Sequence, residues 1–189
     1  MATQTPLGPV PYQPLFCEEN AWQIARTARD HGLEARVVFV TNERQHVAML
    51  RQRASKRSDG LIVWDYHVFA AVERDGRWEA WDPDTTLPMA TPLDRYVAES
   101  FRDETSWEER FRPKLRVIDA DALLRGFYSS REHMKDDDGQ WLAEPPPWPA
   151  ITGTGDAYTL SALRDTSDLR AGPWLTSAQV RATLGSGVG

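Results

Sequence analysis

The 189-residue chain contains a single cysteine, Cys17, and no apolar run that approaches the roughly 20 residues needed to cross a bilayer. One cysteine forms no disulfide within the chain, and no cysteine cluster suggests a structural zinc site. Residues 1–14 also lack the basic and apolar regions of a secretory signal. These absences predict a cytoplasmic protein that neither binds a metal nor associates with a membrane.

The chain has fewer basic than acidic residues: 22 Lys and Arg compared with 28 Asp and Glu, which gives a formal net charge of −6. Nucleic-acid binding domains usually carry a basic face, so we expect no nucleic-acid partner. Hydrophobic residues make up 41% of the chain and charged residues 26%, a balance typical of globular proteins. We therefore predict one domain over residues 1–189, with an irregular lead-in at 1–14, and a monomer, since no heptad pattern requires assembly.

Apolar periodicity predicts several helices. Alanines and Trp22 recur at three- and four-residue spacing over 18–31, which indicates an amphipathic helix ended by Gly32. Further helices are expected over 45–53, 93–101 and 119–127, and near residues 176–179, whose ends have capping-box spacing. For the helix at 93–101, Thr91 is the expected cap and Pro92 the first helical residue.

Runs rich in β-branched and aromatic residues predict strands over 35–40, 61–73, 77–82 and 114–118. Asp75-Gly76 between two of these runs is typical of a two-residue hairpin turn, in which Arg74 pairs with Arg77. In that register His67 shares one face with Asp82 and Asp84, and Asp82 is its diagonal neighbour. The fold class is therefore mixed α/β (α+β), with a largely antiparallel sheet and flanking helices.

Cys17 lies immediately before the first predicted helix. Most lone cysteines are small buried apolar residues, and that alternative stays open. The helix dipole and nearby backbone N–H groups are nevertheless expected to lower the pKa of a thiol at this position. The same N–H groups are suited to stabilise the oxyanion of a tetrahedral intermediate.

Four histidines could serve such a thiol as a base. His31 ends the first predicted helix and suits a capping role, His46 lies in a polar segment, and His133 lies in a segment of uncertain structure. His67 lies within a predicted strand; the alternative is a core histidine bonded to a neighbour. A cysteine before a helix, a histidine on a strand and an aspartate on the next strand together indicate an acyl-transfer enzyme of the papain or transglutaminase arrangement.

Several segments between about Tyr12 and Gly155 resemble the protein N-terminal glutamine amidohydrolase family. In chain order they are Phe16–Asn20 with Trp22, Thr41–Arg44, Trp64–Val68, Asp82–Thr85 with Leu87-Pro88, His133–Asp136 and Glu144–Pro147. The C-terminal part, roughly residues 156–189, matches only loosely.

This resemblance implies a papain/transglutaminase-like fold in which Cys17 is the nucleophile, His67 the base and Asp82 the residue that orients the base. It implies hydrolysis of an N-terminal glutamine to glutamate with release of ammonia, through a thioester on the cysteine. The implied partners are proteins or peptides with a free N-terminal Gln, in a pathway of degradation through N-terminal residues. No metal or organic cofactor is implied.

Recognition of a chain terminus requires an acceptor for a free α-ammonium. Glu18, Glu19 and Asp65 are candidates because they neighbour the predicted catalytic residues in sequence. The alternative, which we favour for each, is compensation of the helix dipole by the two glutamates and a structural strand contact for Asp65.

Other functions are compatible with the same residues. A transglutaminase-like acyltransferase forms the same thioester and resolves it with an amine, and a cysteine protease uses the same triad on a peptide bond. A module that binds N-terminal residues without turnover is a further alternative. Ammonia release without an added amine, and without chain cleavage, distinguishes the hydrolase from all three.

Overall fold

The computed structural model describes residues 7–185; the beginning of the expected lead-in, 1–6, and the end of the C-terminal part, 186–189, lie outside the described residues. Its centre is a five-stranded sheet with neighbour order β6-β5-β4-β1-β7, antiparallel throughout. These strands are β1 (Ala35–Thr41), β4 (His67–Arg74), β5 (Arg77–Trp81), β6 (Thr91–Pro92) and β7 (Lys114–Asp119). Two short strands, β2 (Val47–Met49) and β3 (Ile62–Trp64), form a separate antiparallel pair.

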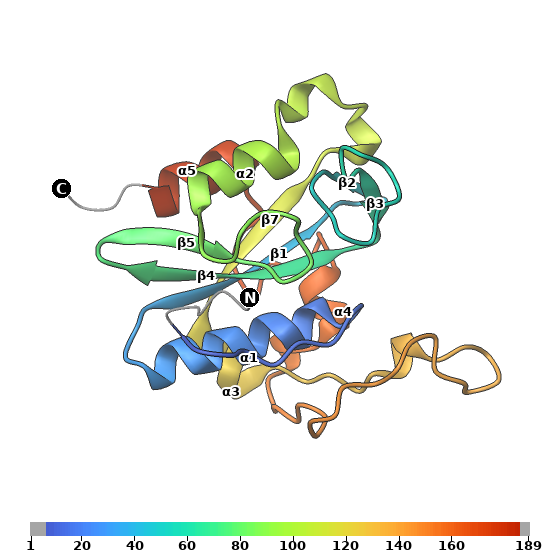
Figure 1. Ribbon diagram of the computed structural model, residues 1–189. Helices are drawn as coiled ribbons and strands as arrows, with labels where there is room; N and C mark the ends of the chain where they lie inside the picture. The colour runs from blue at the N-terminus through green and yellow to red at the C-terminus, as the bar shows by residue number, and fades with distance from the viewer. Residues whose placement is uncertain (1–6, 186–189) are drawn as a thin grey trace.

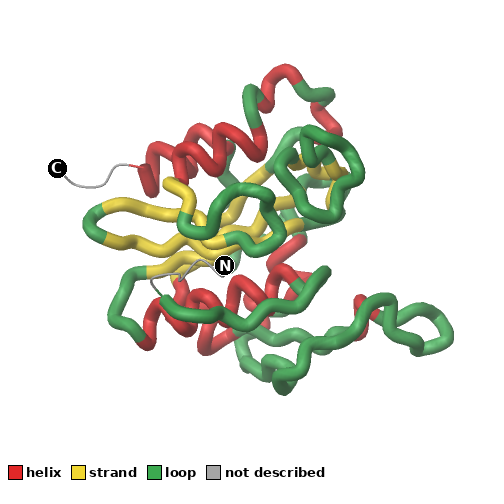
Figure 2. Tube along the Cα trace, viewed as in Figure 1, coloured by secondary structure: helices red, strands yellow, loops and turns green. Residues whose placement is uncertain are grey.

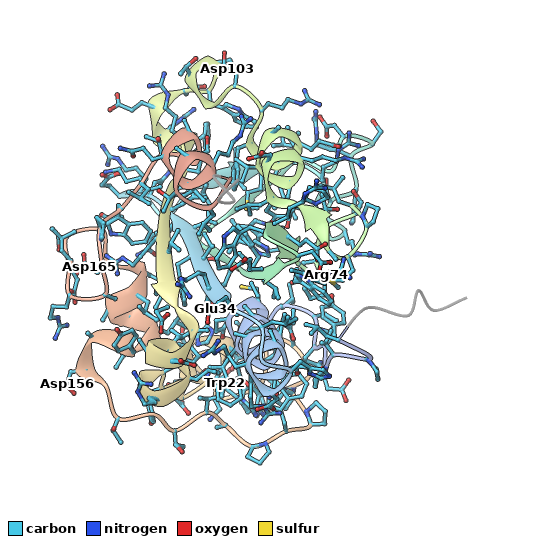
Figure 3. The ribbon with its side chains drawn as sticks, turned by 90° about the vertical axis from the view of Figure 1, so that its left-hand side faces the viewer. Trp22, Glu34, Arg74, Asp103, Asp156 and Asp165 are labelled. Atoms are coloured by element: carbon cyan, nitrogen blue, oxygen red, sulfur yellow. The ribbon has the colours of Figure 1, made fainter. Side chains whose placement is uncertain are left out.

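Helices cover both faces of the sheet (Figure 1). One face carries α1 (Cys17–Asp30), α3 (Ala120–Gly126) and α4 (Leu160–Arg164), and the other carries α2 (Leu93–Phe101) and α5 (Ser177–Gly185). Short 3-10 turns are η1 (Glu104–Ser106), η2 (Glu109–Phe111), η3 (Glu132–Met134) and η4 (Asp156–Tyr158). Figure 3, a quarter turn away, shows the same three layers with the sheet between the two sets of helices.

Strand β1 shows why both faces are covered. Its side chains alternate between the faces: Val37 and Phe39 join the core under α1, whereas Val38 and Val40 join the core under α2 and α5. All four are buried. A strand that is apolar on both faces is stable only between two layers, so this sequence dictates a three-layer arrangement.

Several sequence predictions are confirmed. The helix expected at 18–31 is α1, and the Asp75-Gly76 hairpin has the predicted register with Arg74 opposite Arg77. At the start of α5 the capping box is complete: the Thr176 N–H donates to Gln179 Oε1, and the Gln179 N–H donates to Thr176 Oγ1. The mixed α/β class with an antiparallel sheet and flanking helices is confirmed as well.

Three local predictions are wrong. Residues 45–53 form β2 and turns rather than a helix, since Gln45 and Arg51 adopt positive φ angles of +52° and +62°. The strand expected at 61–73 is broken after Trp64, so that β3 pairs with β2 and only β4 joins the main sheet. Thr91 does not cap α2: it lies in β6, and its hydroxyl donates to the carbonyl of Pro88.

A long excursion, residues 127–155, leaves the layers between α3 and η4; it is almost entirely loop and projects away beside α1 (Figure 2). A fully buried carboxylate fastens it. Glu19 on α1 accepts hydrogen bonds from Arg131 Nε and Nη2, each at 2.7 Å, and from Trp148 Nε1 at 2.7 Å. The side chain of Gln13 also donates to the carbonyl of Glu144 at 2.8 Å, which ties the excursion to the lead-in.

Candidate functional site

A cleft of about 620 Å³ opens where α1 and β4 begin. Cys17, the first residue of α1, and His67, the first residue of β4, both line it. Because α1 packs directly on β4, the sheet fixes the helix terminus beside the strand terminus. The remaining walls come from the lead-in, the loop after β2, the end of β3 and the break that follows it, the turn after β5, the excursion and Arg164 of α4.

A buried hydrogen bond joins two of the predicted site residues. His67 Nε2 lies 3.0 Å from Asp82 Oδ2, and both side chains are at most 2% exposed. The Tyr96 hydroxyl of α2 donates to the same carboxylate oxygen at 2.7 Å, and the Asp84 N–H donates to Oδ1 at 3.0 Å. With Nε2 bound to Asp82, Nδ1 of His67 is the nitrogen free to act as a base in the cleft.

This pair favours its charged form. Burial by itself disfavours an imidazolium, but the Asp82 carboxylate, with smaller contributions from the charges of Asp84 and Glu18, outweighs it and raises the pKa of His67 above its ordinary value. Burial likewise opposes ionisation of Asp82, yet the charge and hydrogen bond of His67, with the Tyr96 hydroxyl, hold the pKa of Asp82 below its usual range. Asp82 can therefore stabilise a proton that His67 accepts.

Cys17 is buried, and its thiol donates to Glu18 Oε2 at 3.6 Å. The sequence prediction of a lowered thiol pKa is wrong: burial first, and then the negative charge of Glu18, raise the pKa of Cys17 well above its ordinary value. A hydrogen bond with the backbone of Val68 acts in the opposite direction but does not prevail. The thiol is thus protonated at rest, and a thiolate requires a base to receive the proton.

A second polar cluster lies beside the thiol. Glu18 is 1% exposed; its Oε2 accepts a hydrogen bond from the Tyr66 hydroxyl at 3.0 Å, and its Oε1 lies 3.5 Å from His133 Nε2. The Tyr66 hydroxyl also lies 3.3 Å from His133 Nε2. Tyr66 and His133 line the cleft. His133 comes from η3 in the excursion, so no periodicity pointed to it; its place in a segment that resembles the family was the one signal.

Of the other carboxylates near the site, two line the cleft and one does not. Glu19 is bound by Arg131 and Trp148 and does not line the cleft. Asp65 lines it, and Arg164 lies 3.2 Å from its Oδ2. Asp84 also lines the cleft, and its Oδ1 accepts a hydrogen bond from the Tyr12 hydroxyl at 2.7 Å.

The two remaining histidines lie outside the cleft. His31 ends α1, where its Nδ1 lies 2.8 Å from the carbonyl of Thr27, as a capping residue should. His46 is exposed. Across residues 7–185 no group of three or more His, Cys, Asp or Glu side chains could hold a metal ion, and no helix in that range is long and apolar enough to span a bilayer.

Comparison with known proteins agrees with these features. A family model described as N-terminal glutamine amidase matches residues 12–184. The chain belongs to this family. Proteins named protein N-terminal glutamine amidohydrolase from Bos taurus and Homo sapiens are each 39% identical to it over 151 residues, covering 77% of this chain and 72% and 73% of theirs. The relative of that name from Arabidopsis thaliana is 35% identical over 160 residues, covering 79% of this chain and 72% of its own.

In this member of the family, the segments that carry the resemblance converge in the cleft. Four of them supply residues that line it: Phe16–Asn20, Trp64–Val68, Asp82–Thr85 and His133–Asp136. A fifth, Glu144–Pro147, does not line the cleft and instead supports the excursion through the carbonyls of Glu144 and Pro146. Residues far apart in the chain thus meet at one site.

Replacing Glu18 tests the electrostatics of the thiol. The Glu18 charge raises the pKa of Cys17, so Glu18→Gln is expected to lower it and to shift the pH profile of alkylation by iodoacetamide to lower pH. Asp30→Asn, which removes an exposed carboxylate at the other end of α1, is the matched control and should leave the profile in place. A profile that stays put, or moves to higher pH, in Glu18→Gln would refute this account of the thiol.

Proposed function

We propose that this protein hydrolyses the side-chain amide of an N-terminal glutamine in proteins or peptides, giving glutamate and ammonia. Membership of the amidase family supports the substrate, since its relatives are named for that reaction. The observation that carries the chemistry is the buried His67–Asp82 pair in the same cleft as the single cysteine. A nucleophile at a helix start, with the base on β4 and the carboxylate directly after β5, also supports a papain/transglutaminase-like fold.

The first half of the proposed reaction forms a thioester. Nδ1 of His67 takes the proton of Cys17, and the thiolate attacks the carboxamide carbon. The oxyanion that develops can accept hydrogen bonds from backbone N–H groups in the first turn of α1, where no side chain caps the described helix. The tetrahedral intermediate collapses as His67 returns the proton to the leaving nitrogen, and ammonia departs.

The second half releases the product. Nδ1 of His67 takes a proton from water, whose oxygen attacks the thioester carbon, and the proton then returns to the departing sulfur of Cys17. Atoms balance as glutamine plus water giving glutamate plus ammonia. In both halves Asp82 holds the imidazole tautomer and stabilises the imidazolium. The raised pKa of His67 is the result of that stabilisation.

The proposal extends to the setting of the enzyme. Residues 1–189 act as one catalytic domain and as a monomer in the cytoplasm, and the new N-terminal glutamate feeds degradation through N-terminal residues. The reaction steps need no metal or organic cofactor, because the thiol and the imidazole supply the nucleophile and the proton transfers. A free α-ammonium needs an acceptor, for which the sequence offers Glu18, Glu19 and Asp65.

A peptide assay tests the proposed function directly. A peptide that begins with Gln should gain about 1 Da and release ammonia without an added amine, because Cys17 and His67 supply the nucleophile and the base. The same peptide with acetylated Gln, or with the Gln placed internally, should remain unchanged. Chain cleavage would identify a protease instead, and turnover only with an added amine would identify an acyltransferase.

The partner of the base is tested by substitution. Asp82→Asn should lower kcat on the order of 10⁴-fold, because the imidazole loses both its orientation and its counter-charge. Asp84→Asn leaves the His67–Asp82 hydrogen bond in place, so its effect on kcat should be much smaller. The reverse ranking, measured by initial rates on the Gln peptide, would contradict the assigned pair.

A further inference from the structure

The carboxylates that the sequence offered for the α-ammonium already have cationic or hydrogen-bonding partners. Glu19 is fully buried below the cleft, with both oxygens bound by Arg131. Asp65 has Arg164 at 3.2 Å. Glu18 does not line the cleft, since Tyr66 and His133 lie against its two oxygens. Glu19 therefore has no oxygen left to accept from an ammonium, and Asp65 already has a cation beside it. Glu18 Oε1 has no hydrogen-bond partner among residues 7–185, but it is buried in a residue that does not line the cleft.

Asp84 combines two features that none of these three has together. It lines the cleft, and no Lys, Arg or His in the described part of the chain forms an ion pair within 4.0 Å of its carboxylate, although the charges of His67 and Arg53 act on it from farther away. The Tyr12 hydroxyl holds Oδ1 at 2.7 Å, which orients the group and leaves Oδ2 without a hydrogen bond from residues 7–185. Burial raises the pKa of Asp84, so a cation at this carboxylate would offset a real desolvation cost.

Its position also suits a glutamine whose amide lies at the thiol. The backbone N–H of Asp84 is bonded to Asp82, so the two carboxylates lie at the ends of one short turn. The negative charge of Asp84 acts on both Cys17 and His67. In an extended glutamine the α-nitrogen lies about 5 Å from the amide carbon, a span set by its bond lengths, so the acceptor must lie near the nucleophile without contacting it.

We propose that Asp84, oriented by the Tyr12 hydroxyl, binds the α-ammonium of the substrate and so restricts the enzyme to chain termini. The proposal rests on the proposed function for the identity of the substrate. Asp84 is then a specificity residue: it accepts a charge-assisted hydrogen bond through Oδ2 while the glutamine side chain extends to Cys17. Acetylation of the terminus removes the cation and leaves this carboxylate without its partner.

Binding to an inactive variant separates recognition from chemistry. In Cys17→Ala protein, titration calorimetry with a Gln-starting peptide and with its acetylated form should show the free peptide binding at least about tenfold more tightly, the scale of one charged hydrogen bond. Adding Asp84→Asn should reduce that ratio to below about threefold by weakening the free peptide alone. Adding Asp121→Asn, which changes a surface carboxylate on α3 that pairs with Arg29 of α1, should leave the ratio unchanged.

Two results would overturn the assignment. One is an unchanged ratio in the Asp84→Asn variant; the other is a ratio that falls in Cys17→Ala protein carrying Asp65→Asn or Glu18→Gln and not in the Asp84 variant. In the active enzyme, Asp84→Asn should raise KM for the free peptide by about tenfold or more, with a smaller change in kcat. A large loss of kcat for the free peptide with KM unchanged would instead place Asp84 in the chemistry and overturn its role in recognition.

The two proposals fail separately. If the unaltered protein releases no ammonia but Cys17→Ala protein prefers the free terminus through Asp84, the reaction is wrong and the ammonium site stands. If ammonia is released from free Gln peptides and the preference does not depend on Asp84, the reaction stands and the ammonium site is wrong. An absence of both turnover and selective binding overturns both.

Discussion

The hydrogen bond between His67 and Asp82 is the interaction on which the site depends. It joins the first residue of β4 to the residue that follows β5, so the hairpin register determines whether it forms. The same carboxylate is bound by Tyr96 from α2 and by the N–H of Asp84, which fixes one helix and one turn around it. Because three groups share this one buried carboxylate, the imidazole of His67 is held in one orientation before any substrate arrives.

The two glutamates that follow the cysteine, Glu18 and Glu19, contact different parts of the molecule. Glu19 points toward the excursion and is neutralised by Arg131, so it fastens a wall of the cleft that begins more than a hundred residues later. Glu18 points toward the thiol and raises its pKa. Their location on the first turn of α1 satisfies the helix dipole in either role. The helix-dipole rule therefore explains why acidic residues suit this turn, but it does not predict which atoms their carboxylates contact.

Local patterns were enough to predict the parts of the site that local structure positions. The helix after Cys17, the Asp75-Gly76 hairpin and the shared face of His67 and Asp82 all follow from periodicity and turn chemistry. The thiol pKa was mispredicted because the helix dipole was counted, whereas the burial of the thiol and the charge of the neighbouring Glu18 were not. Residues 45–53 were mispredicted because helical periodicity does not reveal positive φ angles.

The rest of the cleft depends on contacts between distant segments. Tyr12 reaches the site from the lead-in, Trp64 from the end of β3, and His133 from the excursion. Tyr12 and His133 lie in no pattern of period 2 or 3.6, and the excursion that carries His133 is anchored by contacts such as the Glu19–Arg131 pair. Such long-range placement requires a three-dimensional structure, whereas Cys17, His67 and Asp82 could be proposed from the sequence and its family resemblance alone.

The central claim is that Cys17, activated by His67, forms a thioester with the glutamine side chain. The most direct measurement is the intact mass of the protein after mixing with a Gln-starting peptide and quenching in acid within a turnover. The account predicts a species heavier by the peptide less about 17 Da of ammonia, with the acyl group on Cys17 and none formed by Cys17→Ala. Deamidation by the Cys17→Ala protein, or an acyl group on any other residue, would contradict it.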